Sequence, residues 1–402
     1  MSDSQKSGIN RRNLLKGAAG LTAAATFFPS MFAIGGQAKV KVGLLLPHTG
    51  TYASLGNNIK DALELRIHQA GGILGGREVE IVSIDSEAKP PKASELTNKL
   101  IQKENVDFLV GPVHSVVGMS MVKLARKDGI ITVIPNAGAN QLTGSLCAPN
   151  IFRTSFSSFQ PGYPGGTAML EDGHKRVVLM YWNYGFGKQV AAGFKQSFLA
   201  GGGTIVKEIP TPFPKVDFQA YLTEVAALEP DAVFTFYAGG GAVKFVKDYA
   251  AAGLNKKIPL YGAGFLTEGV TAAQGAAAEG VRTTLHYADS LDLPANHRFR
   301  AAFQKAYGRS ADVYAVQGYD AGDLLIQGMN AVQGDTSVGA RAEMIAAMES
   351  SVIDSPRGKF TFSKSHNPIQ NIYLREVVNG ENRVVRTVAE ALEDPAEGCE
   401  IA

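Results

Sequence analysis

The sequence is poor in cysteine and tryptophan, with two of the first and one of the second among 402 residues. Its seven histidines are scattered, and neither a CxxC pair nor an HExxH motif occurs, so the usual zinc spacings are missing. No GxSxG elbow and no GxxxxGK[ST] loop is present, which removes the usual anchors for acyl transfer and phosphoryl transfer. We therefore expect no metal, no cofactor, no catalytic residue and no enzyme activity.

A strong net charge is also lacking, since 39 Lys and Arg residues face 37 Asp and Glu residues. Residues 1–38 hold four basic side chains and one acidic one, so removing them changes the formal charge from +2 to −1. A nearly neutral chain without basic clusters gives no electrostatic reason to bind nucleic acid. We exclude nucleic acid as a partner.

The first 38 residues have the pattern of a twin-arginine signal peptide. The motif RRNLLK at residues 11–16 precedes an apolar run that is rich in alanine and glycine. Because this run is weakly hydrophobic and interrupted by Pro29, a cleaved signal is favoured over a membrane anchor. Cleavage after Ala38 would start the mature chain at Lys39. The sequence therefore predicts a periplasmic protein.

The two cysteines, Cys147 and Cys399, lie far apart in the sequence. Export to an oxidising compartment makes them a candidate disulfide pair, and two free thiols are the alternative.

Strand and helix patterns alternate along the chain in two successive series. We expect an α/β fold with two doubly wound parallel-sheet lobes, joined by a three-segment hinge. The first series has strands near 40–46, 79–84, 108–110 and 130–134 and helices near 56–69, 92–103 and 115–127. The second has strands near 176–182, 204–209, 232–237 and 259–261 and helices near 188–199, 217–228 and 241–251.

The lobes are expected to be discontinuous in sequence. FRTSFSS at residues 152–158 and SPRGKFTFS at 355–363 are extended segments typical of crossings, and the first precedes a Pro/Gly-rich bend, QPGYPGG. Two later helices, near 296–307 and 314–332, would return to cover the first lobe, and 371–378 would be an edge strand. The predicted division is a signal peptide at 1–38, lobe 1 at 39–155 plus 288–357, and lobe 2 at 156–287 plus 358–402.

The turn before residue 115 is a candidate anion site. GPVHS at residues 111–115 ends a strand and opens a helix, so free backbone N–H groups and the Ser115 hydroxyl can meet an anion there. The alternatives are that Ser115 only caps the helix and that His114 is only a turn residue.

Eight segments occur in order between Val40 and about Leu392: KVGLLLPHTGTYASLG, GGREVEI, FLVGPVHSVV, IFRTS, NYGFG, AGLNKKIPLYGAGF, AAEGV and GYDAGDLL. With them the chain resembles the periplasmic solute-binding proteins of the branched-chain amino-acid (Leu/Ile/Val) ABC transporter family. The resemblance implies the type I periplasmic binding protein fold, in which two lobes close on a small solute. It also implies delivery of that solute to the ABC transporter permease subunits in the inner membrane.

The resemblance also implies ligand-binding positions. In the family's amino-acid binders, a serine at a helix start holds the solute carboxylate, together with backbone and a hydroxyl in a second turn. Tyrosine in a YGxG turn and an aromatic residue in the first turn complete that half of the site. The matching positions here are Ser115, the turn Ala137, Gly138 and Ala139, then Tyr184 and Leu55; Gly138 lacks the hydroxyl.

The half of the site that binds the ammonium group is missing. The acidic residue of the amino-acid binders matches Gly264, and the tyrosine expected near Ala238 and Gly239 is absent. A buried ammonium without its counter-ion would cost several kcal/mol. The solute is therefore expected to be a carboxylate without an α-amino group.

Aromatic residues beside turns that face the cleft suggest what the rest of the solute is: Tyr52, Tyr163, Trp182, Tyr184, Tyr237 and Phe265. Each of them taken alone could be a packing residue, but several around one crevice would suit a flat ring. We expect a monomer that binds an aromatic acid of the benzoate, hydroxybenzoate or hydroxycinnamate type. In this hypothesis His114, Ser115 and residues 137–139 hold the anion, and Tyr184, Tyr237 and Phe265 complete the pocket.

Other functions are compatible with the same pattern. The solute could be a branched-chain amino acid, a short-chain amide, urea or an aliphatic acid. An enzyme on this two-lobed frame would need a catalytic dyad, which the sequence does not show. A ligand-sensing receptor domain would normally carry a transmembrane segment after the domain, whereas this chain stops at Ala402 without one.

Overall fold

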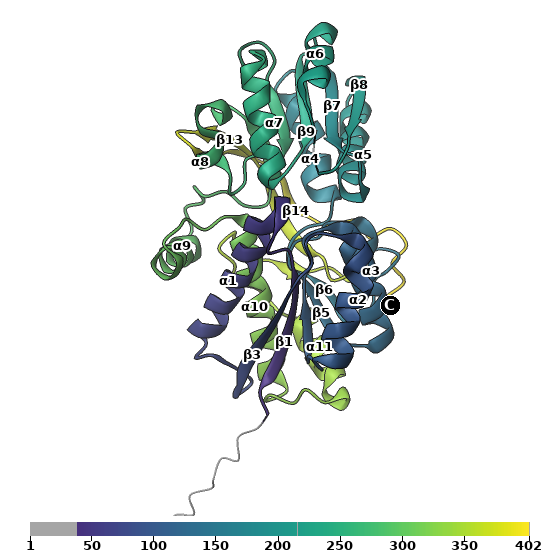
Figure 1. The fold of residues 1–402 in the computed structure, drawn as a ribbon, viewed down its shortest axis with the longest axis vertical. Helices are drawn as coiled ribbons and strands as arrows, with labels where there is room; N and C mark the ends of the chain where they lie inside the picture. Colours follow the sequence, from purple (N-terminus) through teal and green to yellow (C-terminus); the bar gives the residue numbers. More distant parts are fainter. Residues whose placement is uncertain (1–37, 215, 402) are drawn as a thin grey trace, which may run out of the picture. The chain divides into compact units, whose positions relative to one another are not determined.

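The structure is a computed structural model that describes residues 38–214 and 216–401. The predicted signal peptide, apart from Ala38, lies outside the described residues. The remainder, Ala38–Ala402, clusters as one compact unit built on two β-sheets (Figure 1).

The first sheet has six strands in the order β2-β3-β1-β4-β5-β6. Apart from the short antiparallel strand β2, neighbouring strands are parallel, and their buried apolar runs suit a sheet that is covered on both faces. The strands are β1 (Val40–Leu46), β2 (Ile73–Leu74), β3 (Arg77–Asp85), β4 (Phe108–Val110), β5 (Ile131–Ile134) and β6 (Ile151–Arg153).

Helices cover both faces of the first sheet, as Figure 1 shows for α1 and α10 on one side and α2 and α3 on the other. The alternation of side chains along β1 explains this arrangement. Leu44 packs in the same hydrophobic cluster as Ile59 of α1, whereas Leu45 packs with Met121 of α3. The helices of this part are α1 (Ala53–Gln69), α2 (Ala93–Asn98), α3 (Ser115–Asp128), α9 (Pro294–Tyr307), α10 (Val313–Ala331) and α11 (Arg341–Glu349).

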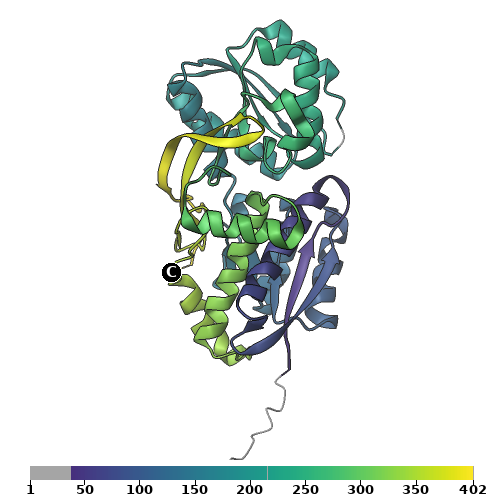
Figure 2. The ribbon, with the colours of Figure 1, turned by 90° about the vertical axis from the view of Figure 1, so that its left-hand side faces the viewer.

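The second sheet runs in the order β12-β13-β11-β10-β9-β7-β8, and β14 pairs with β13. Its central strands are parallel, and β13 is antiparallel to each of its partners; Figure 2 shows the β13–β14 hairpin in yellow. The strands are β7 (Arg176–Trp182), β8 (Thr204–Thr211), β9 (Ala232–Phe236), β10 (Leu260–Ala263), β11 (Arg282–Leu285), β12 (Thr361–Phe362), β13 (Pro368–Val378) and β14 (Glu381–Leu392). The helices are α4 (Phe159–Glu171), α5 (Gly185–Ala200), α6 (Gln219–Leu228), α7 (Gly239–Ala251) and α8 (Thr271–Gln274).

Two local predictions are wrong. The Pro/Gly-rich bend predicted at QPGYPGG is part of helix α4. Pro161 falls in its first turn, where no intrahelical N–H is needed, and the glycines allow α5 to approach closely. A Cβ at Gly162 would lie 2.5 Å from the carbonyl oxygen of Val190. The predicted edge strand at 371–378 is also not an edge, because β13 pairs with β11 as well as with β14.

We propose the lobe boundaries stated above, with one sheet in each lobe. A buried arginine ties two of the crossing segments together in this arrangement. Arg357 donates to the carbonyl oxygens of Thr154 and Ser155, at 2.7 and 3.1 Å, and lies 3.4 Å from the carboxylate of Asp320. This contact fixes the paths of both crossings where they leave the first sheet.

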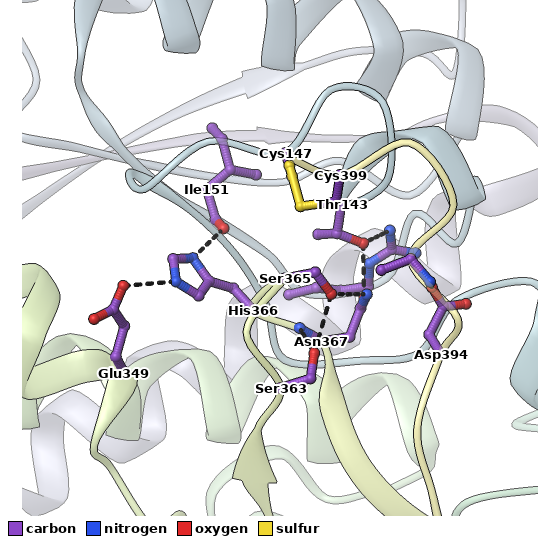
Figure 3. Close-up of a disulfide and its surroundings, with 12 residues drawn as sticks. Thr143, Cys147, Ile151, Glu349, Ser363, Ser365, His366, Asn367, Asp394 and Cys399 are labelled. Carbon is purple, nitrogen blue, oxygen red and sulfur yellow. Dashed lines mark hydrogen bonds and ion pairs between the residues drawn. A yellow bond between two sulfur atoms is a disulfide. The ribbon is translucent and has the colours of Figure 1, made fainter. Parts of the chain in front are cut away.

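The structure joins Cys147 and Cys399 by a disulfide (Figure 3). It connects the segment that follows β14 to the segment between β5 and β6. Beside it, Thr143 of the β5–β6 segment donates to Asn367, in the turn between β12 and β13, at 2.8 Å, so a third segment is also attached here. With the proposed lobe boundaries, Cys147 belongs to lobe 1 and Cys399 to lobe 2. The disulfide then connects the lobes in addition to the predicted three-segment hinge.

Two buried aspartates stabilise the fold more at mildly acidic pH than at neutral pH. Burial raises the pKa of Asp320 to about 7 and that of Asp312 to about 6. Between an unfolded pKa near 4 and these values, the two aspartates bind more protons in the folded state, so their contribution to stability falls as pH rises. Burial lowers the pKa of His114 and His286, which act in the opposite direction, so the prediction concerns Asp320 alone. We expect the free energy of unfolding at pH 5.5 minus that at pH 7.5 to be larger in the wild type than in Asp320→Asn, by on the order of 1 kcal/mol.

Urea titrations at the two pH values measure this difference. Asp320→Asn should reduce it, whereas Asp354→Asn, at a side chain that is 63% exposed, should leave it unchanged. The same pH dependence in the wild type and in Asp320→Asn would contradict the prediction.

Candidate functional site

Turns from both sheets line one small cavity that is partly open to solvent, and about 280 Å³ of space, its opening included, lies among the lining atoms. None of the lining side chains is an aspartate, glutamate, lysine, arginine or histidine. The cavity therefore combines apolar surface with uncharged hydrogen-bonding groups, as small-molecule sites often do. Its lining residues are Tyr52, Leu55, Val113, Ser115, Asn136, Gly138, Phe156, Tyr184, Phe186, Phe236, Ala238, Phe265 and Tyr314.

Ser115 is the first residue of α3 and is buried against the cavity. The cap of this helix is His114, whose Nδ1 accepts a hydrogen bond from the backbone N–H of Val116 at 3.2 Å. The alternative that Ser115 caps α3 is therefore wrong. Among the described residues its hydroxyl has no hydrogen-bond partner, so it is free to donate into the cavity.

His114 lies behind the cavity lining and not in it. Its ring stacks on Tyr184 with 4.8 Å between centroids, and burial lowers its pKa to about 4. The imidazole is neutral at pH 7 and contributes no positive charge to the site. Its role in the structure is to cap α3 and to support Tyr184.

A pair of tyrosines closes one side of the cavity. Tyr52, in the 3-10 turn Gly50–Tyr52, and Tyr184, just before α5, are hydrogen-bonded through their hydroxyl groups at 2.9 Å. Burial raises the pKa of both phenols, so both keep their protons. One hydroxyl donates to the other, which leaves the second proton of the pair for a ligand.

Gly138 lines the cavity at a point where no side chain would fit. A Cβ there would lie 2.3 Å from a ring carbon of Phe186 and 2.6 Å from one of Phe156. The turn is held from both sides: Ser158 donates to the Gly138 carbonyl, and Arg153 donates to that of Ala139 at 3.0 Å. The two aromatic rings thus occupy the space that any side chain at this position would need.

Four phenylalanines form a continuous apolar wall. The ring centroids of Phe186 and Phe236 are 4.6 Å apart, and those of Phe156 and Phe265 are 4.8 Å apart. Phe186 and Phe265 are 5.7 Å apart and connect the two pairs. In the proposed second lobe, Phe236 ends β9, Phe186 lies in the first turn of α5 and Phe265 lies in the 3-10 turn Gly264–Leu266. Phe156 comes from the crossing after β6.

Six of the predicted ligand-binding residues line the cavity: Tyr52, Leu55, Ser115, Gly138, Tyr184 and Phe265. Tyr237 does not. Side chains alternate along a strand, so Phe236 and Ala238 face the cavity while Tyr237 points the other way. Its hydroxyl lies 3.1 Å from Thr211 Oγ1, and its ring packs on Phe245 inside the second sheet's core.

Gly264 also lies away from the cavity. Its carbonyl accepts from Arg375 at 2.9 Å, and a Cβ would lie 2.5 Å from the Cβ of Leu285. A side chain at this position would point into packed protein. Gly239 contacts the first turn instead of the cavity, at Thr51, and Ala137 and Ala139 flank Gly138 without lining the cavity.

Sequence reasoning missed Val113, Asn136, Phe156, Phe186, Phe236, Ala238 and Tyr314. Phe186 stood in the NYGFG turn beside Tyr184, and the alternation of β9 could have selected Phe236 instead of Tyr237. No local signal pointed to Tyr314, because it reaches the cavity from the start of a helix distant in sequence.

A wider polar cleft lies outside this cavity, and its charged groups are mostly occupied by one another. Arg309 pairs with Asp61, and Asp85 accepts from the backbone N–H of His48 and from the hydroxyl of Thr49. Because these charges already have partners, this cleft is a weaker candidate for a ligand site than the smaller cavity.

Two parallel-dominated α/β sheets whose turns enclose one cavity define a class of protein, the two-lobed binding proteins of type I. The chain belongs to the periplasmic binding protein family, whose model matches residues 39–382. A twin-arginine translocation signal matches residues 8–28. In the described part of the chain, no helix is both long and apolar enough to cross a bilayer.

Several known proteins are similar over most of the chain. A Leu/Ile/Val-binding protein homolog from Brucella melitensis is 31% identical over 370 residues, covering 90% of this chain and 93% of the relative. An ABC transporter solute-binding protein from R. palustris, solved with benzoate, is 52% identical with a TM-score of 0.88. The match covers 90% of this chain and 100% of that one. One from Rhodopseudomonas palustris BisB5, solved with 3,4-dihydroxybenzoic acid, is 32% identical with a TM-score of 0.84, covering 89% and 99%.

These comparisons confirm the family resemblance, the type I fold and the periplasmic location that the sequence predicts. The relatives are substrate-binding proteins of ABC transporters. A branched-chain amino-acid binding protein from Streptococcus pneumoniae, solved with isoleucine, is 23% identical with a TM-score of 0.76, and this likeness concerns the fold alone.

Proposed function

We propose that this protein is the substrate-binding component of an ABC importer and that it closes around a small aromatic acid of the benzoate or hydroxybenzoate type. The observation that carries the proposal is the uncharged cavity, which has hydrogen-bond donors at the start of α3 and a wall of four phenyl rings. The aromatic acids bound by two similar proteins support it.

The donors suit a carboxylate, which only accepts hydrogen bonds. The Ser115 hydroxyl, the free N–H groups at the start of α3 and one proton of the Tyr52–Tyr184 pair can all donate. The N-terminal end of a helix also carries a partial positive charge, which favours an anion. A carboxylate can thus be held here without a lysine or arginine.

An amino-acid ligand is disfavoured, because its ammonium would have no counter-ion in the cavity. The buried carboxylate of Glu268 does not line it and is already used. It accepts from Arg375 at 2.6 Å and from the Val313 backbone N–H at 2.7 Å. Burying an ammonium without a partner carboxylate costs several kcal/mol. A micromolar ligand has only about 8 kcal/mol of binding free energy, so this cost would abolish useful affinity.

The phenylalanine wall explains why a ring is favoured over urea or a short amide. Offset and edge-to-face aromatic contacts contribute about 0.5–1.5 kcal/mol beyond burial of area alone. A small polar solute would leave this wall without a partner and would bury little apolar surface.

Closure is proposed to be a population shift, in which a ligand touched by both lobes favours the closed form. With the proposed boundaries, Ser115 lies in lobe 1 and Phe186 in lobe 2, so a ligand between them contacts both. The closed protein then meets the permease subunits as a monomer, and no covalent step is involved.

A thermal-shift screen tests the proposal. Benzoate, 4-hydroxybenzoate and 4-hydroxycinnamate are expected to raise the melting temperature, because a ligand at 100 times its Kd adds about 2.7 kcal/mol to stability. Leucine, valine and urea should have no effect. If only leucine or valine stabilised the protein, the aromatic-acid assignment would be wrong.

Ser115→Ala checks the carboxylate position in the same assay. Loss of a hydrogen bond to a charged group costs about 1.5–3 kcal/mol, so benzoate should bind about 10- to 100-fold more weakly. Benzamide, its neutral analogue, should lose less. The control is Ser350→Ala, which changes the exposed serine that caps the C-terminal end of α11. This variant should bind benzoate and benzamide as tightly as the wild type does.

A further inference from the structure

Tyr314 presents an unused hydroxyl to the cavity. It is the second residue of α10, its side chain is 1% exposed, and it belongs to the cavity lining. Its hydroxyl has no hydrogen-bond partner in the structure. A buried hydroxyl without a partner is unfavourable, so this group indicates a place where a ligand atom completes the bonding.

Asn136 offers an acceptor beside the same helix. Its Nδ2 donates to Gln317 Oε1 at 2.8 Å, and Gln317 follows Tyr314 by three residues, on the same side of α10. Gln317 is itself held 3.3 Å from His286 Nε2, which keeps the amide of Asn136 in place. The Oδ1 of Asn136 has no partner among the described residues, although the side chain lines the cavity.

The charges around Tyr314 favour a neutral partner for its hydroxyl. Burial is the main cause that raises the pKa of the phenol; two buried acids, Asp312 and Glu268, add to the effect, and Arg375 opposes it. The phenol therefore keeps its proton and can donate. Because the proposed function places the ligand's carboxylate at the start of α3, the Tyr314 hydroxyl is left for another polar group of the ligand.

We propose that Tyr314 and Asn136 form a subsite for a hydroxyl group on the ring of the bound acid. The ring hydroxyl would accept from the Tyr314 phenol and donate to Asn136 Oδ1. This inference rests on the proposed function and narrows it: the preferred solutes are hydroxylated aromatic acids, with benzoate a weaker ligand of the same site.

Calorimetric titration of wild type and Tyr314→Phe with benzoate and the 2-, 3- and 4-hydroxy isomers tests the subsite. In the wild type, at least one hydroxy isomer should bind about tenfold more tightly than benzoate, the effect of one good hydrogen bond. In Tyr314→Phe that advantage should disappear, while benzoate binds as well as before or better.

Tyr249→Phe is the matched control, because it removes a buried phenol outside the cavity whose hydroxyl bonds to Ile258 at 3.0 Å. It should keep the preference for the hydroxy isomer. The subsite is refuted if Tyr314→Phe weakens benzoate and its hydroxy isomers by the same factor, which would place the phenol on the carboxylate. It is also refuted if the variant changes no affinity. If no aromatic acid binds to the wild type, the proposed function itself fails.

Discussion

Gly138→Thr is expected to lower the affinity for benzoate by more than about 100-fold, although it restores the type of hydroxyl that amino-acid binders have at this position. The Cβ alone would lie 2.3 Å from the Phe186 ring and 2.6 Å from the Phe156 ring. Such overlap forces both rings from their positions, at a cost of about 1–3 kcal/mol or more, and the added atoms fill part of the cavity. Calorimetric titration with benzoate measures the loss.

Gly185→Thr is the matched control for this variant. Gly185 opens α5 next to Tyr184, and a Cβ at this position would meet no atom within 4 Å. It should bind benzoate within about twofold of the wild type, since exposed substitutions usually change stability by less than 0.5 kcal/mol. A folded Gly138→Thr protein with affinity close to the wild type would contradict the assignment of this cavity as the ligand site.

Loss of the disulfide is expected to have the largest effect on stability. Cys147 and Cys399 are 252 residues apart, and a bond across such a long loop restricts the unfolded chain strongly. The chain-entropy model gives about 5 kcal/mol for this loop, and measured values commonly reach only about 2–4 kcal/mol. Cys147→Ser combined with Cys399→Ser should therefore lower the urea midpoint markedly.

Reductant gives an independent arm of the same experiment. Dithiothreitol should destabilise the wild type to about the level of the double variant and should leave the double variant unchanged. Intact mass without reductant should show a protein two hydrogens lighter than its reduced form. Two free thiols in the protein purified from the periplasm would contradict the pairing.

The order of strands and helices could be predicted because buried parallel strands leave a strong local pattern. The runs at Val40–Leu46, Phe108–Val110 and Arg176–Trp182 are strands with the predicted bounds. Apolar residues must fill both faces of such strands, and polar or glycine-rich turns must follow them. The bend predicted at QPGYPGG was wrong because the same glycines that permit turns also permit close helix packing.

The candidate site could be predicted only in part. Ser115 and Gly138 stand in turns that follow β4 and β5, and the carboxyl ends of parallel strands meet at one edge of a sheet, so their approach follows from topology. Tyr184 follows β7 of the other sheet, and its approach depends on how the two sheets face each other. Tyr237 was predicted to line the pocket and does not, because a shift of one residue along a strand reverses the direction of a side chain. Gly264 was predicted to be a ligand-binding position and lies away from the cavity, because Arg375 from a distant strand fills the space beside it.

By itself, the sequence determined the family, the export signal and the two series of strands and helices. These features depend on residue type and on spacing along the chain. Only the tertiary structure decided that His114 caps α3 and leaves Ser115 free, that four phenylalanines meet in one wall, and that Tyr314 reaches the cavity. Those features depend on which side chains from distant segments share one space, and chain order does not specify that.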